Sequence, residues 1–404
     1  MINRSETPAH YTTIGEIVQK YRLQEQLTIT QLANLTGISK GVISKIETEE
    51  TRRPELRTMR LLIQALFIPE EEIMDAYLKV EQRTEIIEEL LDDAISSNQL
   101  CLVQKLTRSL LSSPQEETDK LLEKLYHHIK RMNHSAIQIM LCQVMIDYAR
   151  EHGMQVYVAK GLLHIYLSMQ DRFSSPETYH TGISVLFYDD LLHTEERILL
   201  HETLLLHAFY LGYYEVCISS GERILKLDQE KNERTIKTIY LLFHAHYLQG
   251  NFQKAAYYEQ LYPGRSQYSL PEYARLMKAL LILSSPYKNA GLYQLKKCLT
   301  YATDKTFFTI MLHMLETLLI ENDLAGVEAL LREHPITVPL QTDCILQKNF
   351  SHLERLLAHF YTKKGELQKA AHHYGKSIQL YSYAFPPHLS PSIQGLLSLT
   401  NDED

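Results

Sequence analysis

The sequence lacks the motifs on which most enzymes depend. Its 404 residues include no tryptophan, only 15 glycines and 13 prolines, and no CxxC pair. No dinucleotide-binding GxGxxG, phosphate-binding P-loop, GxSxG nucleophile elbow or HExxH zinc motif occurs. We therefore expect no enzymatic activity and no cofactor.

The cysteines and histidines are too scattered for a disulfide framework or a metal centre. Histidine pairs at 127–128, 244 and 246, and 372–373 point to different helix faces, and no carboxylate or cysteine completes a ligand set. We therefore predict no metal site. The five cysteines are expected to be reduced core residues: Cys101, Cys142, Cys217, Cys298 and Cys344.

Long hydrophobic runs are also missing. No segment of 18 uncharged apolar residues is present and residues 1–10 are polar, so we expect no membrane span, no signal peptide and a cytoplasmic location. Strand-like alternation is absent, whereas apolar residues recur at helical spacing. With 45% hydrophobic and 22% charged residues, the sequence predicts a globular protein of all-α fold class.

The stretch from Thr28 to Leu66 predicts two short helices joined by a turn, then a third helix. In the turn Gly37-Ile38-Ser39, glycine ends one helix and serine caps the next. Ile43 and Ile46 are three residues apart and share a buried face. This arrangement is a helix-turn-helix. The helices are Ile29 to Thr36, capped by Thr28 with Leu32, Ala33 and Leu35 inward; Lys40 to Glu47; and Glu55 to Leu66 with Leu56, Met59, Leu62, Ile63 and Leu66 inward.

Residues 12–69 resemble the XRE-type (Cro/repressor-like) DNA-binding family. Many members carry Gln at the first position of the second helix, where it meets a phosphate, and this chain has Ile29 there. The resemblance is carried by Ile14-Gly15-Glu16-Ile17, Leu32-Ala33, Gly37-Ile38-Ser39, Ser44-Lys45-Ile46-Glu47, Arg53-Pro54 and Ala65-Leu66.

Helix geometry predicts which residues contact double-stranded DNA. Residues opposite the Ile43/Ile46 face point toward the groove, and the helix N-terminus usually touches base edges. The basic turn after this helix and the outward arginines of the next one, including Arg60, suit phosphates. The predicted DNA-contact residues are Lys40, Gly41, Ser44, Lys45, Arg52, Arg53 and Arg57.

Charge is unevenly divided along the chain. Residues 1–69 hold nine Lys and Arg against seven Asp and Glu, whereas the remainder has a net charge of −10. The acidic remainder repels DNA, so only the N-terminal module is expected to touch the duplex. A weakly positive module needs a second copy to bind tightly, which predicts a homodimer.

After residue 69, helix follows helix with short turns. A helix is expected from Glu70 to about Lys79, then over 83–96, 100–111, 119–132, 137–152 and 157–169. So many helices exceed one bundle core, which predicts an α-solenoid. We expect a helix-turn-helix domain at 1–69, a linker helix at 70–82, the array at 83–385 and a tail at 386–404.

Three windows repeat one pattern: a helix that ends at an aromatic residue, a turn with glycine, and Ala or Val packed in the return helix. They lie at Ala208–Val216, Ala245–Ala255 and Ala358–Ala370, with a weaker copy at Glu321–Val327. From Gly250 to Gly365 there is room for three further units. The windows resemble tetratricopeptide (TPR) repeats, best at Gly365, Leu367, Ala370 and Tyr374; a generic helical array is the alternative.

An XRE-like module joined to a TPR-like array resembles the peptide-pheromone regulators of Gram-positive bacteria, their phages and other mobile elements. The resemblance implies a dimer that binds operator DNA and a concave groove that binds a short imported signalling peptide. The alternative is an adaptor whose array grips a protein partner such as a response regulator, with DNA binding secondary.

A peptide in such a groove needs partners for its backbone, and one Asn side chain satisfies both an N–H and a C=O. Asn232 and Asn349 lie near the beginning of first helices of repeat pairs, so we predict that they bind the peptide. A cap or surface role is the alternative for each. Tyr240, His244 and Arg275 are the expected neighbours.

The C-terminal end of the array is rich in apolar residues that need covering, so we expect the dimer contact there. Alternatively, the Leu-rich tail folds back as a cap, since a solenoid end needs a polar cap or a partner. The residues concerned are Leu353, Leu356, Leu357, Phe360, Ile378, Tyr381, Tyr383, Phe385, Leu396, Leu397 and Leu399, with Pro386-Pro387 ending the array.

Overall fold

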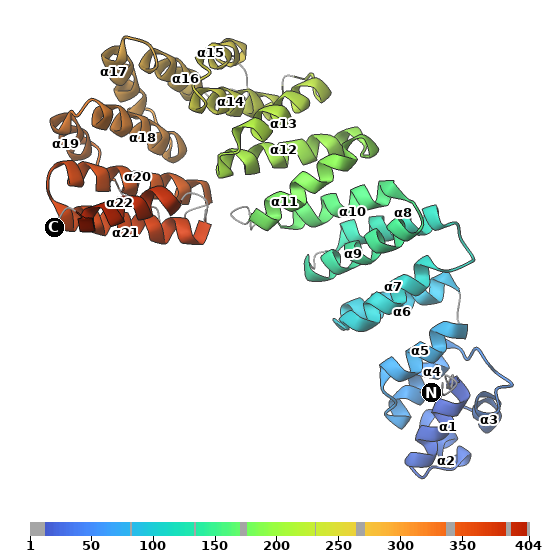
Figure 1. Cartoon of the computed structure of the whole chain (residues 1–404). Helices are drawn as coiled ribbons and strands as arrows, with labels where there is room; N and C mark the ends of the chain where they lie inside the picture. Colours follow the sequence, from blue (N-terminus) through green and yellow to red (C-terminus); the bar gives the residue numbers. More distant parts are fainter. Residues whose placement is uncertain are drawn as a thin grey trace, which may run out of the picture. The chain divides into compact units, whose positions relative to one another are not determined.

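The computed structural model describes residues 13–80, 83–132, 135–169, 176–230, 232–263, 271–336, 344–384 and 389–401. Within these ranges the regular structure is helical and no strand occurs, which confirms the all-α fold class (Figure 1). The chain forms two compact units, Met1–His164 and Ile165–Asp404. The expected domain bounds stay a prediction. None of the described helices combines the length and the apolar character needed to cross a membrane.

The first part of unit 1 is the predicted helix-turn-helix. α1 packs on α3, α4 and α5, and α2 packs on α3 and α4. Thr28 caps α2, Gly37 ends it with a φ of 70°, and Ser39 caps α3, as expected. The helices are α1 (Ile14–Gln24), α2 (Ile29–Thr36), α3 (Lys40–Glu47), α4 (Leu56–Leu66) and α5 (Glu70–Val80).

The inward residues of this module agree with the prediction, except on α2. The five expected core residues of α4 are all buried, but Leu35 is 65% exposed. The buried face of α2 is centred between Leu32 and Ala33. At roughly 100° per residue, Leu35 lies about 110° from that centre and therefore faces outward. The prediction that Leu35 makes an apolar core contact is therefore wrong.

The rest of unit 1 contains the five helices expected over 83–169, each within two residues of its predicted bounds. α6 and α7 form a hairpin, and α9 packs on both α7 and α8. Their bounds are α6 (Thr84–Ser96), α7 (Leu100–Leu111), α8 (Thr118–Arg131), α9 (Ser135–Glu151) and α10 (Gln155–Ser168), the last of which the division between the units crosses.

Unit 2 is a succession of helical hairpins in which each hairpin packs mainly on the next (Figure 1). The hairpins are α12 with α13, α14 with α15, α16 with α17, α18 with α19, and α20 with α21. The bounds are α11 (Pro176–Val185), η2 (Leu186–Leu191), α12 (Thr194–Leu211), α13 (Tyr214–Leu227), α14 (Glu233–Leu248), α15 (Phe252–Leu261), α16 (Pro271–Leu283), α17 (Lys288–Leu299), α18 (Asp304–Ile320), α19 (Leu324–Glu333), α20 (Cys344–Lys363), α21 (Leu367–Ala384) and α22 (Leu389–Asn401).

Most hairpin turns are built on one residue in the left-handed region. After α12, Gly212 has a φ of 81°, and the N–H of Tyr213 donates to the carbonyl of Ala208 at 2.9 Å. This bond satisfies a carbonyl that the helix end would leave unpaired. Asn322 takes the glycine position after α18, with a φ of 58°. The same geometry recurs at Asn98, Gly153, Gly250 and Gly365.

The fifth residue after each of these turn positions is fully buried. In the return helices these residues are Val103, Val158, Cys217, Ala255, Val327 and Ala370, each with 0% exposure. The sequence windows placed Val216 in this role, and that choice is wrong by one residue, because Cys217 is buried and Val216 is partly exposed. Asn98 with Val103, and Gly153 with Val158, show that unit 1 follows the same rule.

The cysteines differ from the expectation at one described position. Cys142 and Cys217 are buried, and burial raises the pKa of each thiol to about 12. Cys298 is partly buried and Cys101 is exposed, because it precedes the buried pair Leu102–Val103 on α7. The side chain of Cys344 lies outside the described residues.

The C-terminal tail folds back onto the array. α22 packs on α21 and α20, with Leu399 buried and Leu396 packed against Ala358, Ala370 and Tyr374. Ser392 meets the buried Ser377 hydroxyl at 2.8 Å. The fold-back alternative therefore describes this end, while Leu397 is 58% exposed. The side chains of Tyr381 and Tyr383, and residues 385–388, lie outside the described residues.

We predict that Gly395→Val lowers the stability of unit 2, because a Cβ at Gly395 lies 2.4 Å from the Tyr374 ring. Overpacking of this kind costs about 1–3 kcal/mol. Chemical denaturation measures the change. The matched control is Gly375→Ala on α21, where an added Cβ meets nothing within 4 Å. The control is expected to be neutral or stabilising; equal losses in both variants contradict the cap contact.

Candidate functional site

The recognition helix α3 presents the predicted DNA-contact residues outward. Ile43 and Ile46 are 0% and 1% exposed and anchor α3 to the module. Lys40, Gly41 and Lys45 are exposed, and Ser44 is partly buried. The helix therefore offers two ammonium groups and a hydroxyl on the side away from its core contacts.

A buried ion pair holds α3 against α1. Arg22 donates from Nε and Nη2 to the two carboxylate oxygens of Glu47, at 2.6 and 2.7 Å, and from Nη1 to the Leu27 carbonyl at 2.8 Å. The hydrogen bond to Glu47 raises the pKa of Arg22. Removing one partner of such a pair leaves an unpaired buried charge, which costs about 3–5 kcal/mol. The pair was not predicted from the sequence, although Arg22 follows Val18 at i+4 on the buried face of α1.

The predicted phosphate contacts divide into two groups. Arg52 and Arg53 are exposed in the turn between α3 and α4, and Arg57 is exposed on α4. Arg60 lies beside two acids of α6, Glu89 at 3.3 Å and Asp93. Its guanidinium therefore forms ion pairs within unit 1, and its expected phosphate contact stays a prediction.

Unit 2 contains a cavity of about 600 Å³, which we call the groove. Its lining comes mainly from the first helices of successive hairpins, α12, α14, α16, α18 and α20. The wall is largely aromatic and aliphatic, with a few polar groups. The lining residues are Leu206, Phe209, Tyr210, Tyr214, Glu233, Ile236, Lys237, Tyr240, Leu241, His244, Leu248, Tyr262, Tyr273, Thr306, Thr309, Leu312, His313, Glu316, Lys348, Asn349 and His352.

Glu316 is the centre of the polar part of the groove. His352 Nε2 lies 3.0 Å from its carboxylate, and His313 Nδ1 lies 3.9 Å away. Burial alone raises the pKa of a carboxyl group, but the hydrogen bond from His352 and the nearby histidines outweigh burial, so the pKa of Glu316 is lowered. Burial lowers the pKa of His313 to about 4.

His244 is buried in an aromatic surround. Its ring meets the Tyr240 ring edge-on at 4.4 Å, and Tyr240 stacks on Tyr273 at 4.3 Å. Burial, with a smaller effect from His313, lowers the pKa of His244 to about 3. His244 is therefore neutral at physiological pH.

Three of the five predicted peptide-binding residues line the groove: Tyr240, His244 and Asn349. Arg275 is exposed, and its guanidinium lies 5.2 Å over the Tyr301 ring, outside the groove lining. Asn232 also lies outside the lining. Of the two predicted asparagines, only Asn349 lies in the same groove as Tyr240 and His244.

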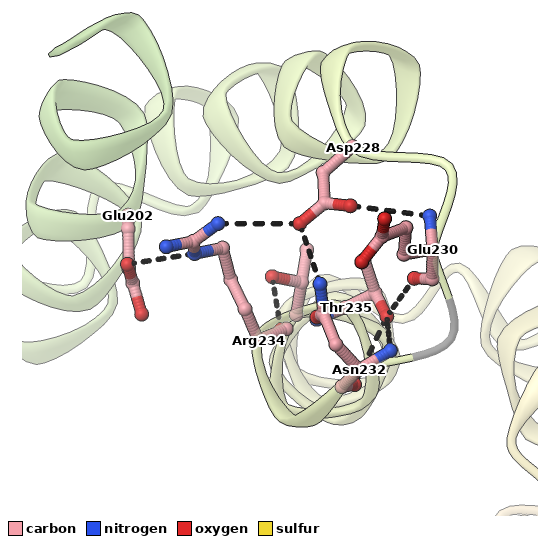
Figure 2. Close-up of polar contacts among 7 residues, drawn as sticks. Glu202, Asp228, Glu230, Asn232, Arg234 and Thr235 are labelled. Carbon is pink, nitrogen blue, oxygen red and sulfur yellow. Dashed lines mark hydrogen bonds and ion pairs between the residues drawn. The ribbon is translucent and has the colours of Figure 1, made fainter. Parts of the chain in front are cut away.

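Asn232 forms the N-cap of α14, as Figure 2 shows. Its side-chain oxygen accepts from the Thr235 N–H at 3.0 Å, and its amide donates to Asp228 at 2.8 Å. Asp228 also accepts a hydrogen bond from Arg234, which donates a second one to Glu202 on α12. Both polar atoms of the Asn232 side chain are therefore engaged within the protein, which is the cap role that the sequence left open.

Several polar residues of the groove lining were not predicted from the sequence, among them His313, Glu316, Lys348 and His352. For His313 and Glu316 a signal was present, since Thr306, Thr309, His313 and Glu316 recur at three- and four-residue spacing on α18 and so share one face. Within the described residues, no three His, Cys, Asp or Glu side chains gather as a metal site.

Comparison with known proteins identifies the N-terminal module. The helix-turn-helix family model HTH_3 matches residues 18–73, so the chain carries a helix-turn-helix domain of the XRE type there. Among curated proteins, no sequence matches the chain.

Two solved structures align over most of the chain. The crystal structure of Bacillus thuringiensis PlcR in complex with the peptide PapR7 and DNA is 17% identical, over 79% of this chain and 99% of that chain, with a TM-score of 0.22. The structure of SeMet-phAimR is 9% identical, over 96% and 97%, with a TM-score of 0.30. At such TM-scores, neither likeness establishes the arrangement or the function of this chain.

We predict that Lys45→Ala and Ser44→Ala each weaken binding to a specific operator by about 1–3 kcal/mol, because we expect both side chains to contact base edges. Arg53→Ala, by contrast, is expected to weaken binding to all sequences alike and to reduce the salt slope by about one. Gel-shift titrations at several salt concentrations measure both effects. Lys254→Ala, an exposed lysine of α15, is the control. A change of sequence preference in Arg53→Ala contradicts the phosphate assignment.

Acid is predicted to destabilise unit 2 through His244. The unfolded chain binds a proton at the ordinary pKa of 6.5, but the folded chain binds it only near 3, so stability falls as the pH drops through that window. At pH 5 the loss from this residue is ~2 kcal/mol relative to neutral pH. Denaturant unfolding of wild type and His244→Gln at both pH values measures it. Identical pH dependence in the two proteins contradicts the neutral buried state.

Proposed function

We propose that this chain is a transcriptional regulator that binds operator DNA as a dimer and senses a short peptide in the groove of unit 2. The helix-turn-helix domain supports the DNA half of the proposal. The groove supports the sensing half and is the observation that carries it: about 600 Å³, mostly apolar, with convergent polar groups. These are the properties of a ligand site.

Dimerisation follows from the requirements of DNA recognition. One helix-turn-helix reads about half a site, and two recognition helices need a separation of ~34 Å, one turn of DNA. The N-terminal module has little excess positive charge, so two copies held together by the acidic remainder explain tight binding. Because α22 covers part of the C-terminal end of the array, the proposed dimer contact uses the part of this end that α22 does not cover, or another surface of the chain.

The groove suits a linear peptide because its lining offers both apolar surface and a hydrogen-bonding side chain. Aromatic side chains from α12, α14 and α16 accept apolar side chains, while Asn349 offers a donor and an acceptor to a peptide backbone. A buried peptide N–H or C=O without a partner costs about 1–3 kcal/mol, so such a group is needed. The proposal places the chain in the cytoplasm and assigns it no enzymatic activity.

The adaptor function remains the second candidate. In this function the groove lining grips an extended segment of a protein partner, and Ile393 and Leu397, exposed apolar residues of α22, enlarge the contact. Affinity purification from the native host separates the two functions. A stable protein partner without a bound peptide favours the adaptor.

We predict that Asn349→Ala reduces peptide affinity by about tenfold or more while DNA binding without peptide is unchanged, because the substitution leaves backbone groups of the ligand unpaired. Isothermal calorimetry with a peptide selected from a pool of short synthetic peptides measures the affinity.

Asn232→Ser is the matched control for this experiment, since serine keeps the N-cap of α14. As a cap, Asn232 is expected to tolerate the change with unaltered peptide affinity. If Asn349→Ala binds as tightly as wild type, Asn349 is not a peptide contact; if Asn232→Ser binds weakly, Asn232 is one.

A further inference from the structure

Lys348 joins two helices that lie on different sides of the groove. From α20, its Nζ donates to the Tyr210 carbonyl at 2.5 Å and lies 3.4 Å from the Phe209 carbonyl, both in the last turn of α12. The residues are 138 and 139 positions apart in sequence. α20 packs mainly on α18, α21 and α22, so this bond reaches past its packing neighbours.

A second lysine of α20 makes the same kind of bond over a shorter range. Lys363 Nζ donates to the Leu319 carbonyl at 2.8 Å and to Asn322 at 3.1 Å, at the end of α18. α18 packs directly against α20, and the residues are 44 apart. Lys363 therefore tightens contact between neighbouring hairpins, whereas Lys348 ties together distant parts of the array.

The chemistry of the Lys348 bond favours a charged ammonium. The last carbonyls of a helix carry partial negative charge, which attracts a cation. Lys348 is partly buried in the groove wall, and burial lowers the pKa of its ammonium to about 8, so it stays mostly protonated at neutral pH. A protonated lysine facing neutral carbonyls makes weaker bonds than it would make with a carboxylate.

We propose that Lys348 is a latch between α12 and α20, and that a carboxylate of the groove ligand takes its ammonium away from the α12 carbonyls. This proposal rests on the proposed peptide-binding function and adds the ligand chemistry and the movement. The carboxylate is the free C-terminus of the peptide or an acidic side chain.

The neighbours of Lys348 place the carboxylate at this end of the groove. Asn349 is adjacent in sequence and also lines the groove, so a ligand bonded to Lys348 brings its backbone to Asn349. The two acidic residues of the groove lining already have partners, Glu316 in His352 and Glu233 in Lys237. Release of the latch removes a bond that spans several hairpins, and an array held together by neighbour contacts then changes its curvature.

The latch itself is tested without any ligand. Hydrogen exchange with mass spectrometry compares Lys348→Met with Lys363→Met in the full chain. We expect about tenfold faster exchange at the end of α12 in Lys348→Met and at the end of α18 in Lys363→Met, because each loses a charged hydrogen bond. Unchanged exchange at α12 in Lys348→Met overturns the latch. If this variant does not fold, Lys348→Gln, which removes the charge and shortens the side chain but keeps it polar, takes its place.

The carboxylate step is tested with two pools of short synthetic peptides, one with free C-termini and one amidated. Affinity selection with wild type is expected to retain free-acid peptides, or amidated ones that contain Asp or Glu, which separates the two sources. Lys348→Met is expected to bind a retained peptide about tenfold more weakly, with Lys363→Met as control.

Retention of amidated peptides without acidic residues, or equal binding by Lys348→Met, overturns the carboxylate step. If neither pool is retained, the peptide-binding function fails and the carboxylate step fails with it. The exchange experiment still decides separately whether Lys348 is a latch.

Discussion

The array depends on one local constraint, the residue in the left-handed region that reverses the chain after a first helix. Only glycine or asparagine occupies this place in the six turns, from Asn98 to Gly365, since other side chains are strained there. The backbone bond that accompanies it fixes the exit direction of the chain. Five residues later a small or β-branched residue or cysteine is fully buried, which lets the return helix approach the first helix closely.

Stacking of these hairpins places the first helices side by side, and the groove is a consequence. An inner face shared by α12, α14, α16, α18 and α20 collects polar residues from distant parts of the chain. Burial shifts the pKa values of several of these residues away from those of the same residue types on the surface. His244 and His313 are held neutral, whereas Glu316 keeps its charge because His352 lies beside it.

The DNA-binding module depends on a different constraint. Its recognition helix is held by the Arg22–Glu47 ion pair and by the close approach of Gly15 to the backbone of α3. Both contacts lie within the module, so α3 is positioned by its own domain. The regulation that we propose for unit 2 therefore leaves the internal geometry of the DNA-binding module unchanged.

Sequence patterns alone determined the features that depend on neighbouring residues. Helix bounds, the caps Thr28 and Ser39, the core face of α4 and the glycine turns follow from spacing and backbone preference, which act over a few positions. The outward positions of Lys40 and Lys45 follow for the same reason. Misplacements such as Leu35 and Val216 arose where a face was judged from two or three residues only.

Only the tertiary structure decided which residues meet across the chain. Asn232 and Asn349 look alike in sequence, but one caps a helix and the other lines the groove, because the stacking of hairpins determines which turn of a helix faces inward. The same holds for Arg22 with Glu47 and for Lys348 with the end of α12. Partners 25 and 138 residues apart leave no periodic signal, since their proximity results from the packing of separate helices against one another.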